Sequence, residues 1–234
     1  MLRFCGGCFW RVDYDNDDNA AGMAPVIYLY PPNNDEPFDV DVTVNVIGEL
    51  TTVFPKPQEY EGTSKCTWHV QASKGSKILL RNNHITSDEL NNSKMNQKEF
   101  IYDYLLWESL FKDFRPSFSQ GFIVPREESG NFLEQALFEM GLNDSERNEF
   151  IVFWLHKLEK HPYNIISFEN ELIKEYGQLT ITPTPDSLLR VFMCYRPCST
   201  FPSEFFITPQ KFSPFVRVGF TVVEWGGCKC AKYN

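Results

Sequence analysis

The stretch FDVDVTVNV, residues 38–46, alternates apolar side chains with aspartate, threonine and asparagine. Successive side chains of a β-strand point to opposite faces, so this pattern predicts a strand with one face buried and one face in water. Such strands are typical of antiparallel sheets. The neighbouring sequence predicts further strands at 26–30, 50–54, 67–72 and 77–81. The first third of the chain therefore predicts an antiparallel β-sandwich or a curled sheet.

Two apolar faces of helical period lie in the middle of the chain. The first consists of Phe132, Leu133, Ala136, Leu137 and Met140, and the second of Phe150, Ile151, Trp154, Leu155 and Leu158. Between them, Gly141 suits a helix C-terminus, and Asn143 with Glu146 has the spacing of a capping box. Two helices joined by so short a turn predict a helical hairpin that lies on the sheet.

The remaining segments are assigned by the same criteria. Strands are expected at 165–168, 179–182, 188–195 and 217–225, with a short helix near 169–176, whereas 82–97 is polar and predicts a long loop. Residues 100–111 fit neither period well. The predicted fold class is α+β, an antiparallel β-sandwich or curled sheet with an inserted helical hairpin.

The chain has 234 residues, of which 42% are hydrophobic and 15% aromatic, which suits one large domain. Residues 1–23 contain an acidic, asparagine-rich stretch and predict a flexible segment with cysteines. We expect a single α+β domain over 24–227 and a cysteine-containing tail over 228–234.

The formal net charge of −9 disfavours binding to nucleic acid or anionic lipid, because the summed field repels phosphates. No stretch is apolar for long enough to predict a membrane span. The first residues lack the apolar core of a signal peptide, so we expect the 7 cysteines to be free thiols in the cytoplasm.

Several segments resemble an uncharacterised family whose members occur in bacteria and fungi. They are PVIYLYP (25–31), YLLWES (104–109), NEFIVFWL (148–155), TPTPDSLLRVFM (182–193) and GFTVVEWGG (219–227). The landmarks follow the same order as in that family, and the resemblance covers roughly residues 24–227. It implies one folded unit, a domain of unknown function, and it brings no assigned catalytic residues.

Two glutamates are candidate catalytic residues. Glu224 shares a strand face with Phe220 and Val222 and precedes Trp225, and Glu108 follows Trp107. An acid beside an indole in an apolar pocket can have its pKa raised, and two such acids across a cleft would suit glycoside hydrolysis. The alternative is structural, since Glu224 can pair with Arg190 or Arg217.

Aromatic residues supply the candidate binding site. Their apolar bodies and polar tips suit a groove for a small molecule, a carbohydrate or a protein. The alternative for each is core packing. The candidates are Tyr28, Tyr30, Trp107 and Trp225, together with Arg190.

The terminal cysteines are the candidate metal ligands. Cys5 with Cys8, and Cys228 with Cys230, could hold zinc through four thiolates if the termini meet. A redox pair and lipid attachment at a cysteine-rich end are alternatives, and free thiols without a cofactor are the expected state. The other three cysteines, Cys66, Cys194 and Cys198, are predicted to be ordinary core or loop residues.

The sequence therefore leads to one main hypothesis and two alternatives. The main hypothesis is a non-catalytic ligand-binding or protein-interaction domain with a site near Glu224. The alternatives are a hydrolase that uses Glu108 and Glu224 as paired acids, and a zinc- or thiol-redox-responsive protein that uses the terminal cysteines.

Overall fold

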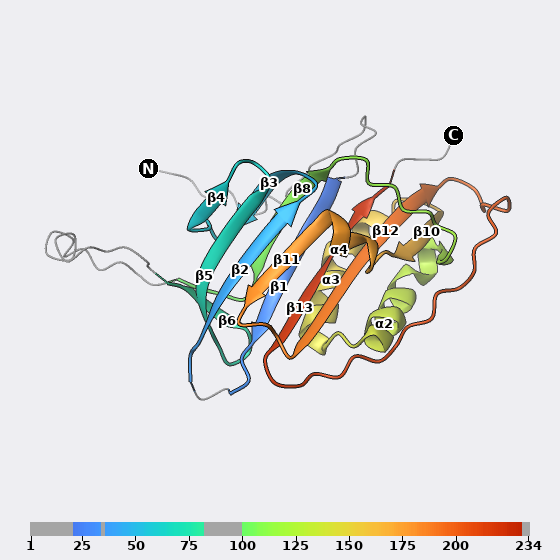
Figure 1. Ribbon diagram of the computed structural model, residues 1–234. Coiled ribbons are helices and arrows are strands. Elements are labelled where there is room, and N and C mark those ends of the chain that lie inside the picture. Colours follow the sequence, from blue (N-terminus) through green and yellow to red (C-terminus); the bar gives the residue numbers. More distant parts are fainter. Residues whose placement is uncertain (1–20, 34–35, 82–99, 231–234) are drawn as a thin grey trace, which may run out of the picture.

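A computed structural model describes residues 21–33, 36–81 and 100–230 as two stacked β-sheets with helices on one side (Figure 1). The seven-stranded sheet has the order β3 (Gly48–Phe54), β8 (Leu105–Phe111), β1 (Ala21–Tyr30), β13 (Thr221–Lys229), β12 (Ser187–Cys198), β10 (Tyr163–Phe168) and β9 (Phe122–Pro125). The six-stranded sheet has the order β11 (Gly177–Thr182), β2 (Phe38–Val46), β5 (Lys65–Ser73), β6 (Lys77–Leu80) and β7 (Ile101–Tyr102), with β4 (Glu59–Glu61) paired to β5.

The helices are few and mostly lie between β9 and β10 in the sequence. A 3₁₀ turn at Arg126–Glu128 leads into α2 (Ser129–Met140), which is followed by α3 (Asp144–Leu158), and a short α4 (Leu172–Tyr176) precedes β11. In Figure 1, α2 and α3 lie against the face of the seven-stranded sheet that points away from the other sheet. The α+β class is confirmed.

Two apolar cores flank the seven-stranded sheet. The inter-sheet core contains Leu29, Val42, Trp68, Trp107 and Phe192. The helix-side core contains buried residues of α2 and α3 together with Tyr28, Val223 and Trp225. The central strand β13 is therefore buried on both faces from Thr221 to Cys228, as strands covered on both sides usually are.

One pairing departs from the predicted antiparallel sheet. Among the paired strands that the structure describes, β12 and β13 run parallel, and the other strand pairs are antiparallel. The connection over residues 199–220 carries the chain back to the end at which β12 began, which a parallel pair requires. The antiparallel prediction was wrong for this pair of strands.

The local signals are confirmed where they are strongest. The valines of β2 are buried and alternate with more exposed residues. Gly141 adopts a left-handed φ of 95° at the end of α2. Asn143 caps α3 by accepting a hydrogen bond from the Glu146 amide, and the Glu146 carboxylate accepts one from the Asn143 amide.

The predicted boundaries need adjustment. The sheet begins at Ala21, three residues before the expected start, and β13 continues to Lys229, so the tail expected from residue 228 begins inside the sheet. The ambiguous stretch 100–111 forms β7 and β8. The loop predicted at 82–97 and residues 1–20 lie outside the described residues. In the described part of the chain, no helix combines the length and apolar character needed to cross a membrane.

Candidate metal centre

Glu224 lies in the inter-sheet core with a hydrogen-bond donor on each oxygen. Arg190, its register neighbour on β12, donates from Nε to Oε2 at 2.5 Å, and Trp107 donates from Nε1 to Oε1 at 2.9 Å. The Arg190 and Glu224 side chains are 4% and 3% exposed. The other arginine considered, Arg217, donates to Glu146 instead. Glu224 is thus part of a buried ion pair, the structural role that the sequence offered as an alternative to catalysis.

Glu108 does not share a cleft with Glu224. Trp107 faces the inter-sheet core, and because successive strand residues alternate, Glu108 faces the helices. Burial and neighbouring Lys160 lower the pKa of Lys157 on α3 to about 8, and Glu108 opposes that shift, consistent with its helix-side position. The two carboxylates lie on opposite faces of the seven-stranded sheet, so they cannot flank one glycosidic bond.

Three of the residues predicted for the aromatic groove, Tyr28, Tyr30 and Trp225, pack in the helix-side core, whereas Trp107 and Arg190 contact Glu224 in the inter-sheet core. The Tyr28 hydroxyl donates to Glu149 at 2.7 Å and accepts from Trp225 Nε1 at 3.1 Å, and Trp225 is 3% exposed. The Tyr30 hydroxyl donates to Glu146 at 2.6 Å. Burial and the neighbouring Glu149 raise the pKa of Tyr28. The two tyrosine hydroxyls bind carboxylates of α3 and the Trp225 indole binds Tyr28, so these polar tips have partners within the protein and the core-packing alternative fits them.

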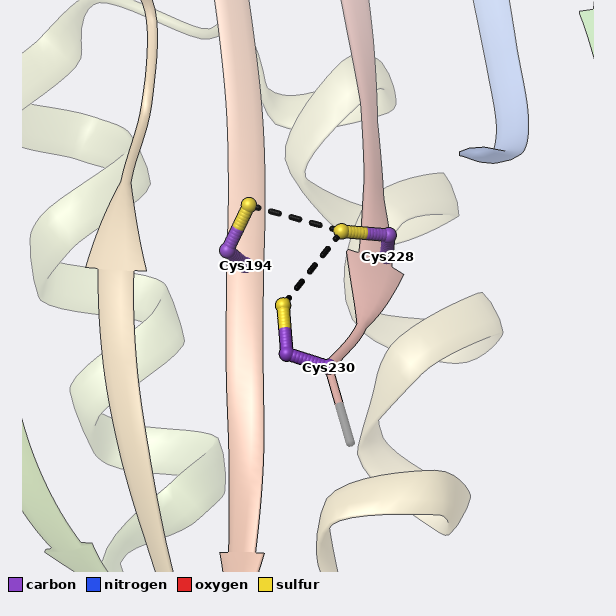
Figure 2. A group of neighbouring side chains, drawn as sticks. All are labelled: Cys194, Cys228 and Cys230. Carbon is purple, nitrogen blue, oxygen red and sulfur yellow. Dashed lines mark hydrogen bonds between the residues drawn. The ribbon is translucent and has the colours of Figure 1, made fainter. Parts of the chain in front are cut away.

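Three cysteine sulfurs converge at the far end of the same two strands. Cys194 on β12 and Cys228 on β13 are register partners with their Sγ atoms 3.4 Å apart, and the Sγ of Cys230 lies 3.8 Å from that of Cys228. The three sulfurs all lie within 4.8 Å of one another, and Figure 2 shows the side chains pointing toward a common centre. We call Cys194, Cys228 and Cys230 the thiol cluster.

The backbone fixes the thiol cluster firmly. Cys194 and Cys228 occupy neighbouring parallel strands, and the amide of Cys230 donates to the carbonyl of Tyr195 at 2.8 Å. Cys194 and Cys228 are 0% exposed and Cys230 is 6% exposed, and all three belong to the inter-sheet core. The sulfurs are therefore held in place by strand pairing, away from water.

The cluster does not titrate as three independent thiols. Burial raises the pKa of Cys194, whereas hydrogen bonds from Cys194 and Cys228, assisted by the charge of Arg196, lower the pKa of Cys230. Three sulfurs at this spacing could hold a metal ion.

Sequence reasoning identified this centre in part. Cys228 and Cys230 were among the candidate metal ligands, with free thiols as the expected state, whereas Cys5 and Cys8 lie outside the described residues. Cys194 is a core thiol, as predicted, but the approach of its Sγ to those of Cys228 and Cys230 was not predicted. It lies 34 positions from Cys228, and only the parallel register of β12 and β13 brings the two together.

The remaining cysteines behave as predicted. Cys66 is buried in the inter-sheet core, where burial raises its pKa to about 12, and Cys198 is half-buried at the end of β12.

Comparison of the chain with protein-family models, with curated proteins and with solved structures gave no match. The thiol cluster and its surroundings therefore supply the evidence for function.

Proposed function

We propose that this protein is a non-catalytic binding domain whose ligand is a thiophilic metal ion held by Cys194, Cys228 and Cys230. The observation that carries the proposal is the approach of three sulfurs to within 4.8 Å of one another on two paired strands. Thiolate sulfur is a soft donor that selects soft or borderline ions such as Cu(I) and Zn(II) over Mg²⁺ and Ca²⁺.

Preorganisation supports the proposal. A flexible thiol set must lose conformational freedom to gather around an ion, whereas the strand ladder has already placed Cys194 opposite Cys228. The Cys230 backbone is also fixed, by its hydrogen bond to Tyr195. Little conformational entropy of the cysteines remains to be lost when the ion binds, so binding to the folded state should be favourable.

The rest of the molecule supports a binding role rather than hydrolysis. Glu224, one of the two acids considered for catalysis, already has Arg190 and Trp107 as partners, and Glu108 lies on the other face of the sheet. In this proposal the helical hairpin of α2 and α3 is a covering layer that closes the second core. Reduced thiols require a reducing compartment, which agrees with the cytoplasmic location expected from the sequence.

We also propose that the chain belongs with the uncharacterised family that has VIYLYP and EWGG motifs. The two motifs lie on β1 and β13, which pair in register from Val26 opposite Trp225 to Tyr30 opposite Thr221. A pair of motifs that builds the centre of one sheet is a reasonable signature of a shared fold.

Titration with Cd(II), a spectroscopic substitute for thiophilic ions, tests the proposed function. Reduced, full-length protein should bind one Cd(II) with thiolate charge-transfer absorption, and the absorption should be lost in Cys194→Ser and in Cys228→Ser. Cys66→Ser is the matched control, because Cys66 is a buried thiol outside the cluster. Equal Cd(II) absorption in all three variants, each shown to be folded by circular dichroism, would overturn the proposal.

A further inference from the structure

We infer that the thiol cluster is a three-coordinate site for Cu(I) rather than a four-coordinate site for zinc. This inference rests on the proposed function, since it names the ion that the same sulfurs would take. It is carried by the number of donors and by their burial, and the spacing of the sulfurs shows that one ion fits among them.

The number of donors favours Cu(I). In the part of the chain that the structure describes, the group contains three sulfurs and no histidine or carboxylate. Structural zinc sites are almost always tetrahedral with four protein ligands, and catalytic zinc fills its fourth position with water or substrate. Cu(I) is a soft, singly charged ion that forms stable complexes with three thiolates.

Burial disfavours water as a fourth ligand. Cys194 and Cys228 are fully buried, and the inter-sheet core around them is built from residues such as Phe192 and Ile165. A buried water needs polar partners, and the polar groups on the β10 flank, Ser167 and Glu169, are bonded to each other. Burial also limits the access of aqueous oxidants, which readily convert Cu(I) to Cu(II).

The spacing of the sulfurs is small enough for one metal ion. With a metal–sulfur bond of about 2.3 Å, sulfurs lie about 4.0 Å apart in a trigonal plane and about 3.8 Å apart in a tetrahedron. Cys228 Sγ lies 3.4 Å from Cys194 Sγ and 3.8 Å from Cys230 Sγ, and the third separation does not exceed 4.8 Å. Side-chain rotations that move the sulfurs by a few tenths of an ångström would seat the ion without moving the strands.

The nearest alternative is a zinc site completed by Glu169. Ser167 is the register partner of Cys194 on β10, and its hydroxyl donates to the Glu169 carboxylate at 2.6 Å. Glu169 thus approaches this flank of the cluster but has a hydrogen-bond partner there, and it does not belong to the group of converging ligands. Zinc with three sulfurs and one oxygen would require the free carboxylate oxygen of Glu169 to move into the group of converging sulfurs, to which it does not belong.

Competition for Cu(I) tests the inference. Reduced full-length protein, kept free of oxygen, is given Cu(I) as its acetonitrile complex in the presence of a chromogenic Cu(I) chelator. We expect one Cu(I) per chain and three sulfur neighbours in X-ray absorption. Cys194→Ser and Cys228→Ser should weaken binding by more than the roughly 100-fold that loss of an outer-sphere partner costs. Glu169→Gln and the double variant Cys5→Ser/Cys8→Ser should bind Cu(I) as the parent does.

The outcomes separate the inference from the proposed function. Cluster-dependent Cd(II) binding without Cu(I) binding, a fourth ligand in X-ray absorption, or loss of binding in Glu169→Gln or Cys5→Ser/Cys8→Ser would overturn the Cu(I) inference alone. Failure of both Cd(II) and Cu(I) to bind would overturn both. Folded variants are required throughout, and circular dichroism of each provides that check.

Discussion

The parallel ladder of β12 and β13 carries two buried side-chain pairs that have opposite chemistry. Arg190 lies opposite Glu224, and four residues further along both strands Cys194 lies opposite Cys228. Both pairs face the inter-sheet core. In the first pair, both oxygens of the carboxylate have donors, whereas in the second the sulfurs contact each other and Cys230.

The difference shows which buried groups remain available for function. A buried charge is so costly that the fold must satisfy it internally, which occupies its bonding capacity. A thiol is a small, weakly polar group that tolerates burial while it is neutral, and it keeps its capacity to bind a soft ion. The conspicuous carboxylate of the EWGG motif is therefore structural, and the less conspicuous cysteines form the candidate site.

The largest expected effect comes from removing one charge of the ion pair. Glu224→Gln leaves Arg190 buried without a counter-charge, and we expect a loss of about 3–5 kcal/mol in the free energy of unfolding. Glu36→Gln, at an exposed position, should stay within about 0.5 kcal/mol of the parent. Urea denaturation measures both. Equal midpoints for the two variants would show that Glu224 has no special role.

Removing both charges should restore much of that loss. In Arg190→Met/Glu224→Gln the amide oxygen can still accept from Trp107, and no unpaired charge remains. Nη2 of Arg190 is already buried without a hydrogen-bond partner in the described structure, so removing the guanidinium also removes an unsatisfied donor. We expect the double variant to be more stable than Glu224→Gln by roughly 2–4 kcal/mol in urea denaturation.

The double variant also tests whether the two pairs are independent. Because the thiol cluster lies four residues along the ladder, Cd(II) binding should match that of the parent. If the double variant is no more stable than Glu224→Gln, or if it loses Cd(II) binding, the contrast drawn between the two pairs does not hold.

The smallest effect on stability is expected for His69, whose carboxylate partners lie near the surface. His69 on β5 contacts Asp41 through Nδ1 at 2.7 Å and Glu59 through Nε2 at 3.1 Å. The hydrogen bond to Asp41, assisted by Glu59, raises the pKa of His69 against the opposing effect of burial. The stabilisation is therefore fully present below the unfolded pKa of about 6.5 and is lost as the pH rises through the higher folded value.

The measurement is the free energy of unfolding of the parent and of His69→Gln over a range of pH. Since Asp41 and Glu59 are substantially exposed, the pH-dependent part of the difference should be below about 1 kcal/mol. The difference between parent and variant should shrink as the pH rises above neutrality. A difference that grows with pH would contradict the assigned ion pair.

Part of the fold and of the site could be predicted because the relevant signals are local. The alternating valines of β2 and the capping box of Asn143 and Glu146 depend on residues within one element, and both are found in the structure. Arg190 and Arg217 were the two arginines proposed as ion-pair partners of Glu224, and no local sequence signal distinguishes them. The decision required the register of β12 and β13, which pairs Arg190 with Glu224, while Arg217 binds Glu146.

By itself, the sequence determined the mixed α+β character, most strands, two helices with their caps, and the strand face that Glu224 shares with Phe220 and Val222. Only the tertiary structure decided which face of the sheet each carboxylate occupies and which cysteines meet. The reason is physical: strand period and capping act over a few residues, whereas the parallel pairing follows the long connection at 199–220 and joins residues 34 positions apart. Cys194 became a candidate ligand through that pairing.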